Sequence, residues 1–557
     1  MSRDTCFATQ GELVKLAYDA FGVLPRKEAS HDDIDDTQKK AIQKQLVRLA
    51  KEEGGLLSNF EQVIQTLSSI LTAYLPSIQV MSAIGDPLDD LLEAYSRLVR
   101  EEGTYLSKAE TLRYFISIRA IPLLVVSLNQ SLLKHRIADL ALEVPEDEFW
   151  YLPTVAEDGR LVMPLEKVMR WVYARCDLSQ TQFHYPGKNP RSDNNTLQQN
   201  LDNAIKWMRG ARLPALPALF RNFEESFAAL AQIGREIPKE LQVSIFVALT
   251  VARVSNYLAR EITDAYDHHY LADVCEQFRE YALWIADDVN EFKAELAPVM
   301  QRQESPESAL YTWLNACSHY WAFFDGKLAA VADTVQRLMD ARPGAPLRDD
   351  VLAALKSKYG LFAVCSLLDR IQRQSAFLPP HGFVELLYQG FELKNDPATQ
   401  VSQIDEYAAQ VAAYDLDEQL CWMVPWLRGV YHYRNEQFEA AMPHFQAAFE
   451  NAKYRAGKNQ YKLVNQYVEV AAKNDDRRGF KKGIEWAQYL GIKVRWLRDE
   501  EPTEESWTPF ISSCKRRGTT TKCSVCGCPV HPLLRSRSKR WLGWVTNHIS
   551  GLLMLWW

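Results

Sequence analysis

Long apolar runs are missing from this sequence. No uninterrupted apolar stretch reaches the roughly 18 residues that a helix needs to cross a bilayer. The opening residues, MSRDTCFATQGELVKL, hold no apolar core of the kind found in secretory signals. Positive charge is not in excess either: the formal net charge is −7, so binding of a polyanion would need a local basic patch. We expect a cytoplasmic protein with no membrane partner.

The common enzyme motifs are also missing. The sequence has no G-x-x-x-x-G-K-[ST], no G-x-S-x-G and no H-E-x-x-H. The nearest approach to a catalytic cluster is REITDAYDHHYLAD (260–273), where one helix would bring Asp264 beside His268 and His269 beside Asp273. A carboxylate beside an imidazole can bind a metal or tune a general base, but no third ligand can be named. A hydrogen-bonded surface pair is the simpler interpretation, and no catalytic residue is assigned.

Amphipathic helical patterns fill most of the chain. The 557 residues are 47% hydrophobic and 24% charged, which is ordinary for a globular protein. In LLSNFEQVIQTLSSILTAYL (56–75), apolar residues such as Phe60, Val63 and Leu67 recur on one helical face. FWYLPTVAEDGRLVMP (149–164) breaks the pattern and predicts one short β-hairpin. FFDGK (323–327) suggests a turn that interrupts a helix. The sequence predicts an all-α, multi-helical fold.

Breaks in the pattern divide the chain into five predicted segments. They are an N-terminal helical domain (1–150), a segment with the short hairpin (151–235), a central helical domain (236–380), a helical repeat region (381–501) and a tail (502–557).

The tail has a composition of its own. Six of the ten cysteines are scattered singly through helical sequence and suit reduced, buried thiols, whereas the other four crowd into residues 514–528. The Cys523-x-x-Cys526 spacing suits one side of a zinc site, but no second pair follows. The alternatives are a disordered basic tail, out-of-frame sequence, or a short membrane anchor in WLGWVTNHISGLLMLWW. The tentative metal ligands are Cys514, Cys523, Cys526, Cys528 and His531; no other cofactor is expected.

Residues 164–223 contain three expected helices and a distinctive ending. The second long helix closes at Arg209-Gly210, where glycine suits the left-handed position after a helix. Pro214 prevents continuation, and Pro217 suits the first turn of the next helix. Together with Ser179-Gln180, these residues make the segment similar to a Cro/repressor-type helix-turn-helix domain. The resemblance implies contact with DNA.

Local charge agrees with DNA contact. Residues 164–223 carry nine basic and four acidic side chains, a balance of +5 in a chain of −7. Cations would contact phosphates while amide side chains read base edges. An ordinary helix–loop–helix with solvated cations remains the alternative. The candidate nucleic-acid-binding residues are Gln180, Gln198, Gln199, Asn203, Lys206, Arg209 and Arg212.

The repeat region carries the second resemblance. WLRGVYHYRNEQFEAAMPHFQAAFENA (426–452) resembles a tetratricopeptide repeat, which implies a pair of antiparallel helices and a partner-binding surface. Two small alanines would let the helices approach, and aromatics would fill the remaining space. A plain helical hairpin is the alternative. The residues that carry the resemblance are Gly429, Tyr433, Phe438, Ala441, Phe445 and Ala448.

A weaker copy follows at 463–492, with Gly483 where an alanine is expected. Phe438 and Phe480 are 42 positions apart (480 − 438), more than the usual repeat of about 34, so AGKNQYK (456–462) is expected to be an enlarged connection. An earlier unit at 383–419 would supply a third hairpin.

These patterns predict a non-enzymatic regulator or sensor. It would bind a protein or peptide partner through 381–501, and DNA through 164–223. One alternative is a scaffold, or a component of a bacterial multi-protein system such as phage defence, without a nucleic-acid role. Another is an enzyme with an unrecognised site.

Overall fold

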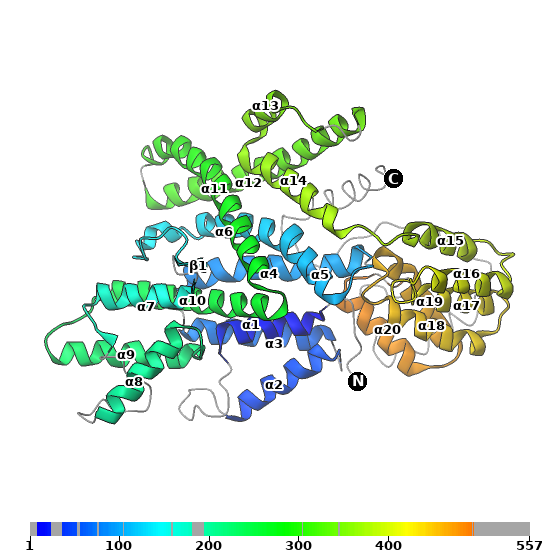
Figure 1. The fold of residues 1–557 in the computed structure, drawn as a ribbon, viewed down its shortest axis with the longest axis horizontal. Helices are drawn as coiled ribbons and strands as arrows, with labels where there is room; N and C mark the ends of the chain where they lie inside the picture. Colours follow the sequence, from blue (N-terminus) through cyan, green and yellow to red (C-terminus); the bar gives the residue numbers. More distant parts are fainter. Residues whose placement is uncertain are drawn as a thin grey trace.

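The protein is helical from one end of the described chain to the other (Figure 1). The computed structural model describes residues 8–23, 36–52, 56–74, 77–103, 105–156, 160–180, 194–303, 305–342, 346–492 and 494. The predicted all-α, multi-helical fold is confirmed. The predicted hairpin is also present: β1 (Thr154–Val155) pairs antiparallel with β2 (Leu161–Val162).

The helices divide into four consecutive groups. The first comprises α1 (Gln10–Phe21), α2 (Asp36–Ala50), α3 (Leu56–Tyr74), α4 (Ile78–Glu101), α5 (Lys108–Tyr114) and α6 (Ile121–Lys134). The second comprises α7 (Pro164–Arg175), α8 (Asn194–Met208), α9 (Leu216–Gln232) and α10 (Lys239–Ala265). The third comprises α11 (His268–Met300), α12 (Pro306–Ala341), α13 (Asp349–Tyr359) and α14 (Leu361–Gln374). The last comprises α15 (Phe383–Asn395), α16 (Val401–Ala413), α17 (Met423–Arg434), α18 (Phe438–Ala452), α19 (Gln460–Lys473) and α20 (Arg477–Tyr489).

Helix ends follow local sequence chemistry. Thr9 and Glu12 form a capping box at the start of α1, each side chain accepting a hydrogen bond from the backbone N–H of the other. Gly210 follows α8 with φ of +69°, the left-handed conformation predicted for it. Pro217 stands in the first turn of α9, also as predicted.

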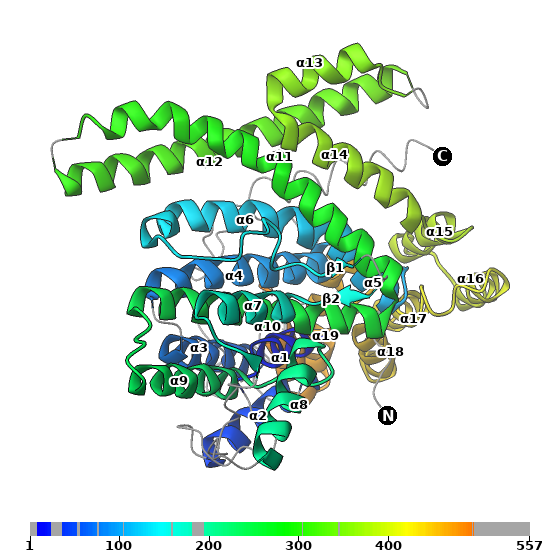
Figure 2. The ribbon, with the colours of Figure 1, turned by 60° about the vertical axis from the view of Figure 1, so that its left-hand side comes forward.

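Two main hydrophobic cores hold the molecule together. One is built by α1–α3 with α7–α10. The other is built by α4 and α6 with α11–α14, and it continues without a break through α15–α20. Figure 2 shows α11–α14 lying over α4 and α6, with α1–α3 and α7–α10 beneath them.

The predicted segments are therefore not separate units in space. Segment 1–150 contributes α1–α3 to one core and α4–α6 to the other. Segment 236–380 likewise gives α10 to the first core and α11–α14 to the second. Residues near 150, 235 and 380 lie between helices, and apolar faces on either side of them pack into the same cores.

One turn of π-helix joins α5 to α6. This segment, η1 (Phe115–Ala120), carries the buried Arg119, whose guanidinium lies 3.0 Å from the Glu102 carboxylate. The Ser117 carbonyl accepts a hydrogen bond of 2.9 Å from the buried amide of Gln277 on α11. A π-turn shifts backbone carbonyls out of the regular pattern of helical hydrogen bonds. The Gln277 side chain, from a neighbouring helix, supplies a hydrogen-bond donor for one of these carbonyls.

Helices α11 and α12 form a long antiparallel hairpin that projects from the body (Figure 2). The sequence suggested a turn at residues 323–327, but α12 runs unbroken through them. Gly326 costs α12 some helix propensity without ending it, because buried side chains such as Phe324 and Leu328 bind this part of α12 to the core.

Two helical stretches in the described chain are long and apolar enough to cross a membrane. They are Lys108–Lys134 and Lys239–Ala265. Of the 18 most apolar consecutive residues in each stretch, 61% and 50%, respectively, are buried inside the protein. Such burial is typical of core helices.

Candidate binding surfaces

The repeat region forms three antiparallel helical hairpins: α15 with α16, α17 with α18, and α19 with α20. The residues of the expected repeat meet between α17 and α18. Ala441, Phe445 and Ala448 are fully buried, and a Cβ added at Gly429 would lie 3.1 Å from the Phe445 ring. The Tyr433 ring packs edge-on against Phe438, with centroids 5.6 Å apart. Small side chains thus lie where the helices approach most closely.

The hairpin of α19 and α20 has Gly483 at the position where an alanine is expected. The packing around Gly483 explains this difference. Phe449 on α18 stacks on Tyr467 of α19, with centroids 4.5 Å apart and planes within 11°. At Gly483 on α20, a Cβ would lie 2.6 Å from Val468 Cγ2. That distance is too short for an alanine unless α19 or α20 moves.

The enlarged connection between α18 and α19 anchors the array to the rest of the protein. Gly103, after α4, forms an isolated β-bridge with Ala456, and the Gln460 amide donates 2.8 Å to the Val99 carbonyl. The buried Lys453 ammonium lies 3.2 Å from the carboxylate of Glu52, a residue just after the end of α2. The connection between α18 and α19, which lengthens the repeat, therefore also attaches the repeat region to the ends of α4 and α2.

Helices α15, α17 and α19 are the first helices of their hairpins and are joined by side-chain contacts. The Trp426 indole on α17 donates 2.7 Å to Gln466 Oε1 on α19, and the Tyr433 hydroxyl donates 2.7 Å to Glu469. From α15, the Lys394 ammonium lies 4.7 Å from the centre of the Trp426 ring. We call this surface the first-helix face.

Positive charge gathers on the first-helix face. Lys394, Arg434 and Lys462 come from α15, α17 and α19 in turn, and the charges of Arg434 and Lys462 act on the Lys394 ammonium. Burial, together with smaller effects of the Lys462 and Arg434 charges, lowers the pKa of the Lys394 ammonium to about 8. The Lys394 ammonium donates to Asn395 Oδ1 at 3.1 Å, a neutral acceptor. Sequence reasoning missed this cluster because its members are up to 68 positions apart (462 − 394).

Helix α8 carries most of the residues predicted to contact DNA. Gln198, Gln199, Lys206 and Arg209 are exposed, and Asn203 is half-buried. At 100° per residue the four positions on α8 fall within one face of the helix, and Arg209 follows its last residue. The same face carries the exposed Asp202, which accepts a hydrogen bond of 3.0 Å from the Gln198 amide. Arg212, just past the end of α8, is exposed as well. The opposite face is buried through Asn200, Ala204, Trp207 and Met208.

Two apolar residues of α8 lie outside that buried stripe. Leu201 and Ile205 are only half-buried, although they are spaced seven and three residues before the buried Met208. Trp207, with about 1% of its surface exposed, takes the central place because its large ring fills the space below α8.

Gln180 lies apart from the exposed cations. Its amide is 3.4 Å from the Met208 sulfur, on the inner side of α8. Residues 181–193, where the helix-turn-helix resemblance would continue its second helix, lie outside the described chain. Among the described helices, α7 packs on α8 and α10, while α9 packs on α10.

The acid–imidazole cluster is split by a helix break. Helix α10 ends at Ala265 and α11 begins at His268, with Asp267 as its N-cap. Asp264 and His268 therefore do not share one helical face. Asp273 is paired with Arg373 at 2.7 Å. Within the described residues, no group of three or more His, Cys, Asp or Glu side chains could hold a metal ion. The tentative zinc ligands, Cys514 to His531, lie outside those residues.

Comparison with known proteins adds no family: no protein-family model, no curated protein and no solved structure matches the chain.

Proposed function

We propose that the protein is a non-enzymatic binding protein whose first-helix face holds an acidic segment of a protein partner. The observation that carries this proposal is the convergence of Lys394, Arg434 and Lys462 from three successive hairpins. Gathering like charges costs free energy in the free protein, and a bound carboxylate offsets that cost.

The half-buried Lys394 ammonium lies over the fully buried Trp426 ring, which partly desolvates it. Partly desolvated cations bind carboxylates more strongly than fully hydrated ones, because hydrogen bonds to charged groups contribute about 1.5–3 kcal/mol. A bound carboxylate would also raise the lowered pKa of Lys394, so binding should weaken as the pH rises through about 8.

Phage display of random 16-residue peptides on the immobilised protein tests this proposal. The parent should enrich peptides rich in Asp and Glu. Synthetic versions of those peptides should bind Lys394→Gln/Lys462→Gln about 10- to 100-fold more weakly, which corresponds to about 1.5–3 kcal/mol.

A matched control removes the same charge elsewhere. Lys239 and Lys481 are exposed and lie outside the first-helix face, so Lys239→Gln/Lys481→Gln should keep parental affinity. Selection of peptides without acidic enrichment, or equal loss in both double variants, would contradict the proposal.

DNA binding by α8 is the second proposed function. It is supported by the exposure of Lys206, Arg209 and Arg212 beside amide-bearing residues. Cations on one exposed face can contact phosphates, whereas buried cations could not. A salt-dependent gel shift with the parent and Arg209→Glu is the test. Binding that stays unchanged in Arg209→Glu would refute a role for α8.

A further inference from the structure

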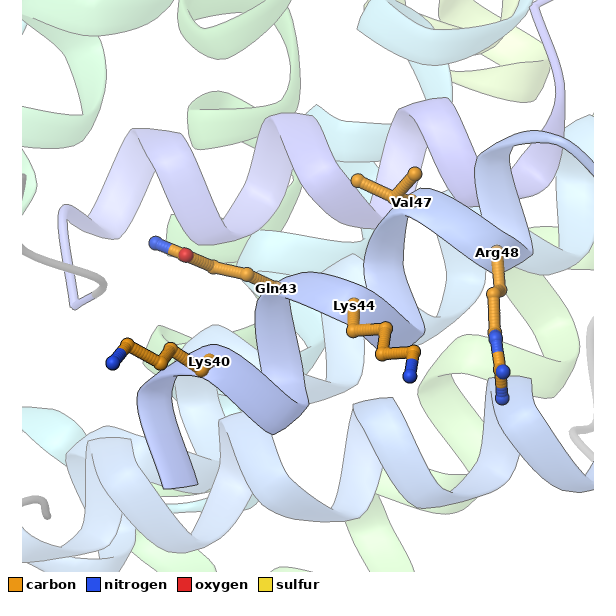
Figure 3. A pocket seen from close by; sticks show the side chains of 5 residues that line it. All are labelled: Lys40, Gln43, Lys44, Val47 and Arg48. Atoms are coloured by element: carbon orange, nitrogen blue, oxygen red, sulfur yellow. The ribbon is translucent and has the colours of Figure 1, made fainter. Parts of the chain in front are cut away.

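A stripe of positive charge runs along the exposed side of α2. Lys40, Lys44 and Arg48 are four residues apart, so each lies about 6 Å further along the helix axis than the last. Figure 3 shows these three side chains on α2 together with those of Gln43 and Val47. The five side chains line an open hollow of about 540 Å³. We call Lys40, Lys44 and Arg48 the α2 stripe.

The side of α2 opposite the α2 stripe is packed in a hydrophobic core. Ile42, Leu46 and Leu49 are buried against the α1–α3 and α7–α10 core, so α2 cannot turn its charges inward. Within the described part of the chain, none of the three cations forms an ion pair with a carboxylate. Their charge is therefore available to a ligand.

Charge and position favour a nucleic acid over other anionic partners. In both views α2 and α8 lie along the lower edge of the molecule (Figure 1 and Figure 2). A duplex backbone carries evenly repeated charge, which suits the evenly spaced cations of the α2 stripe. A helix that binds a membrane surface inserts its apolar face into the lipid, but the apolar face of α2 is in the core.

We infer that the α2 stripe contacts the phosphate backbone of duplex DNA and that, with α8, it gives the protein a two-helix DNA-binding surface. The inference extends the second proposed function, and α2 and α8 are tested by separate variants. The α2 stripe supplies affinity through counterion release, whereas the amides of α8 are the groups able to read bases.

The test measures the anisotropy of a fluorescein-labelled 30-base-pair duplex of mixed sequence from 50 to 200 mM KCl. Lys40→Gln/Lys44→Gln/Arg48→Gln removes three contacts and keeps residues with good helix propensity. The slope of log K against log salt should fall by about 2.7, which is three contacts at about 0.9 each. Raising the salt fourfold should then cost this variant about 40-fold less affinity than it costs the parent.

The matched control is Lys293→Gln/Arg302→Gln/Arg342→Gln, which removes three exposed charges from the α11–α12 hairpin. The control should keep the parental slope. Equal slopes for the parent and the α2 variant would overturn the inference, as would binding of phosphatidylserine vesicles without binding of DNA, or no DNA binding at 50 mM KCl.

The variants also separate the two helices. Loss of affinity in the α2 variant with none in Arg209→Glu would support the inference and contradict the role proposed for α8. Loss in Arg209→Glu with none in the α2 variant would do the reverse.

Discussion

Glycine-to-alanine exchange at Gly483 gives a direct test of how α19 packs on α20. In a helix interior, alanine is more favourable than glycine by about 0.5–1 kcal/mol. At Gly483, however, the new Cβ would lie 2.6 Å from Val468 Cγ2 and 3.1 Å from Tyr467 Cδ1. Overpacking of this kind costs about 1–3 kcal/mol. The net effect should be a loss of up to about 2.5 kcal/mol.

Gly326 is the matched control. It lies inside α12, and nothing stands within 4 Å of the position of an added Cβ. Gly326→Ala should therefore stabilise α12 by the full propensity gain. The difference between the two variants isolates the clash at Gly483, about 1–3 kcal/mol.

Urea unfolding followed by tryptophan fluorescence measures the global effect, and hydrogen exchange of peptides from 460–489 and 306–341 locates it. The reasoning fails if Gly483→Ala stabilises the protein as much as Gly326→Ala does. A destabilising Gly326→Ala would instead indicate that the chain turns at residues 323–327.

Two further predictions concern charges that the fold buries. Lys453→Met leaves the Glu52 carboxylate without the cation 3.2 Å away, whereas Glu450 keeps its ion pair with Lys482. Unfolding in urea should therefore show a loss of about 3–5 kcal/mol, which Glu52→Gln/Lys453→Met should partly restore; parental stability of the single variant would contradict this. His444 stacks on His432 with centroids 5.4 Å apart, and burial, then the charges of His432 and Arg428, lower its pKa below the ordinary value of about 6.5. Folding therefore favours neutral His444, so stability should fall as the pH drops below about 6.5, and His444→Gln should flatten the difference between unfolding at pH 7.5 and 5.5.

Local features of the fold could be predicted from the residues that form them. The end of α8 at Gly210 and the start of α9 near Pro217 depend on backbone conformations that glycine and proline favour by themselves. The break in the helical pattern at residues 149–164 likewise predicted the short β1–β2 pair. Within 426–452, the spacing of Ala441 and Ala448 predicted where two helices approach closely.

Features that depend on residues far apart in the sequence could not be predicted. The turn expected at residues 323–327 is helical because packing outweighs the weak helix propensity of Gly326. The 42-residue interval showed that a connection was enlarged, but not that it docks on Gly103 and Glu52. The spacing of Lys40, Lys44 and Arg48 is visible in the sequence, yet the end of the molecule on which α2 lies is not.

The sequence by itself determined that the chain is helical and where several helices end, because these depend on side-chain periodicity and on backbone preferences within a few residues. The tertiary structure alone decided that α1–α3 share a core with α7–α10, and that Lys394, Arg434 and Lys462 meet on one face. The physical reason is that burial of apolar surface has no direction: many pairings of amphipathic helices satisfy the same pattern, and only the packing of the whole chain selects among them.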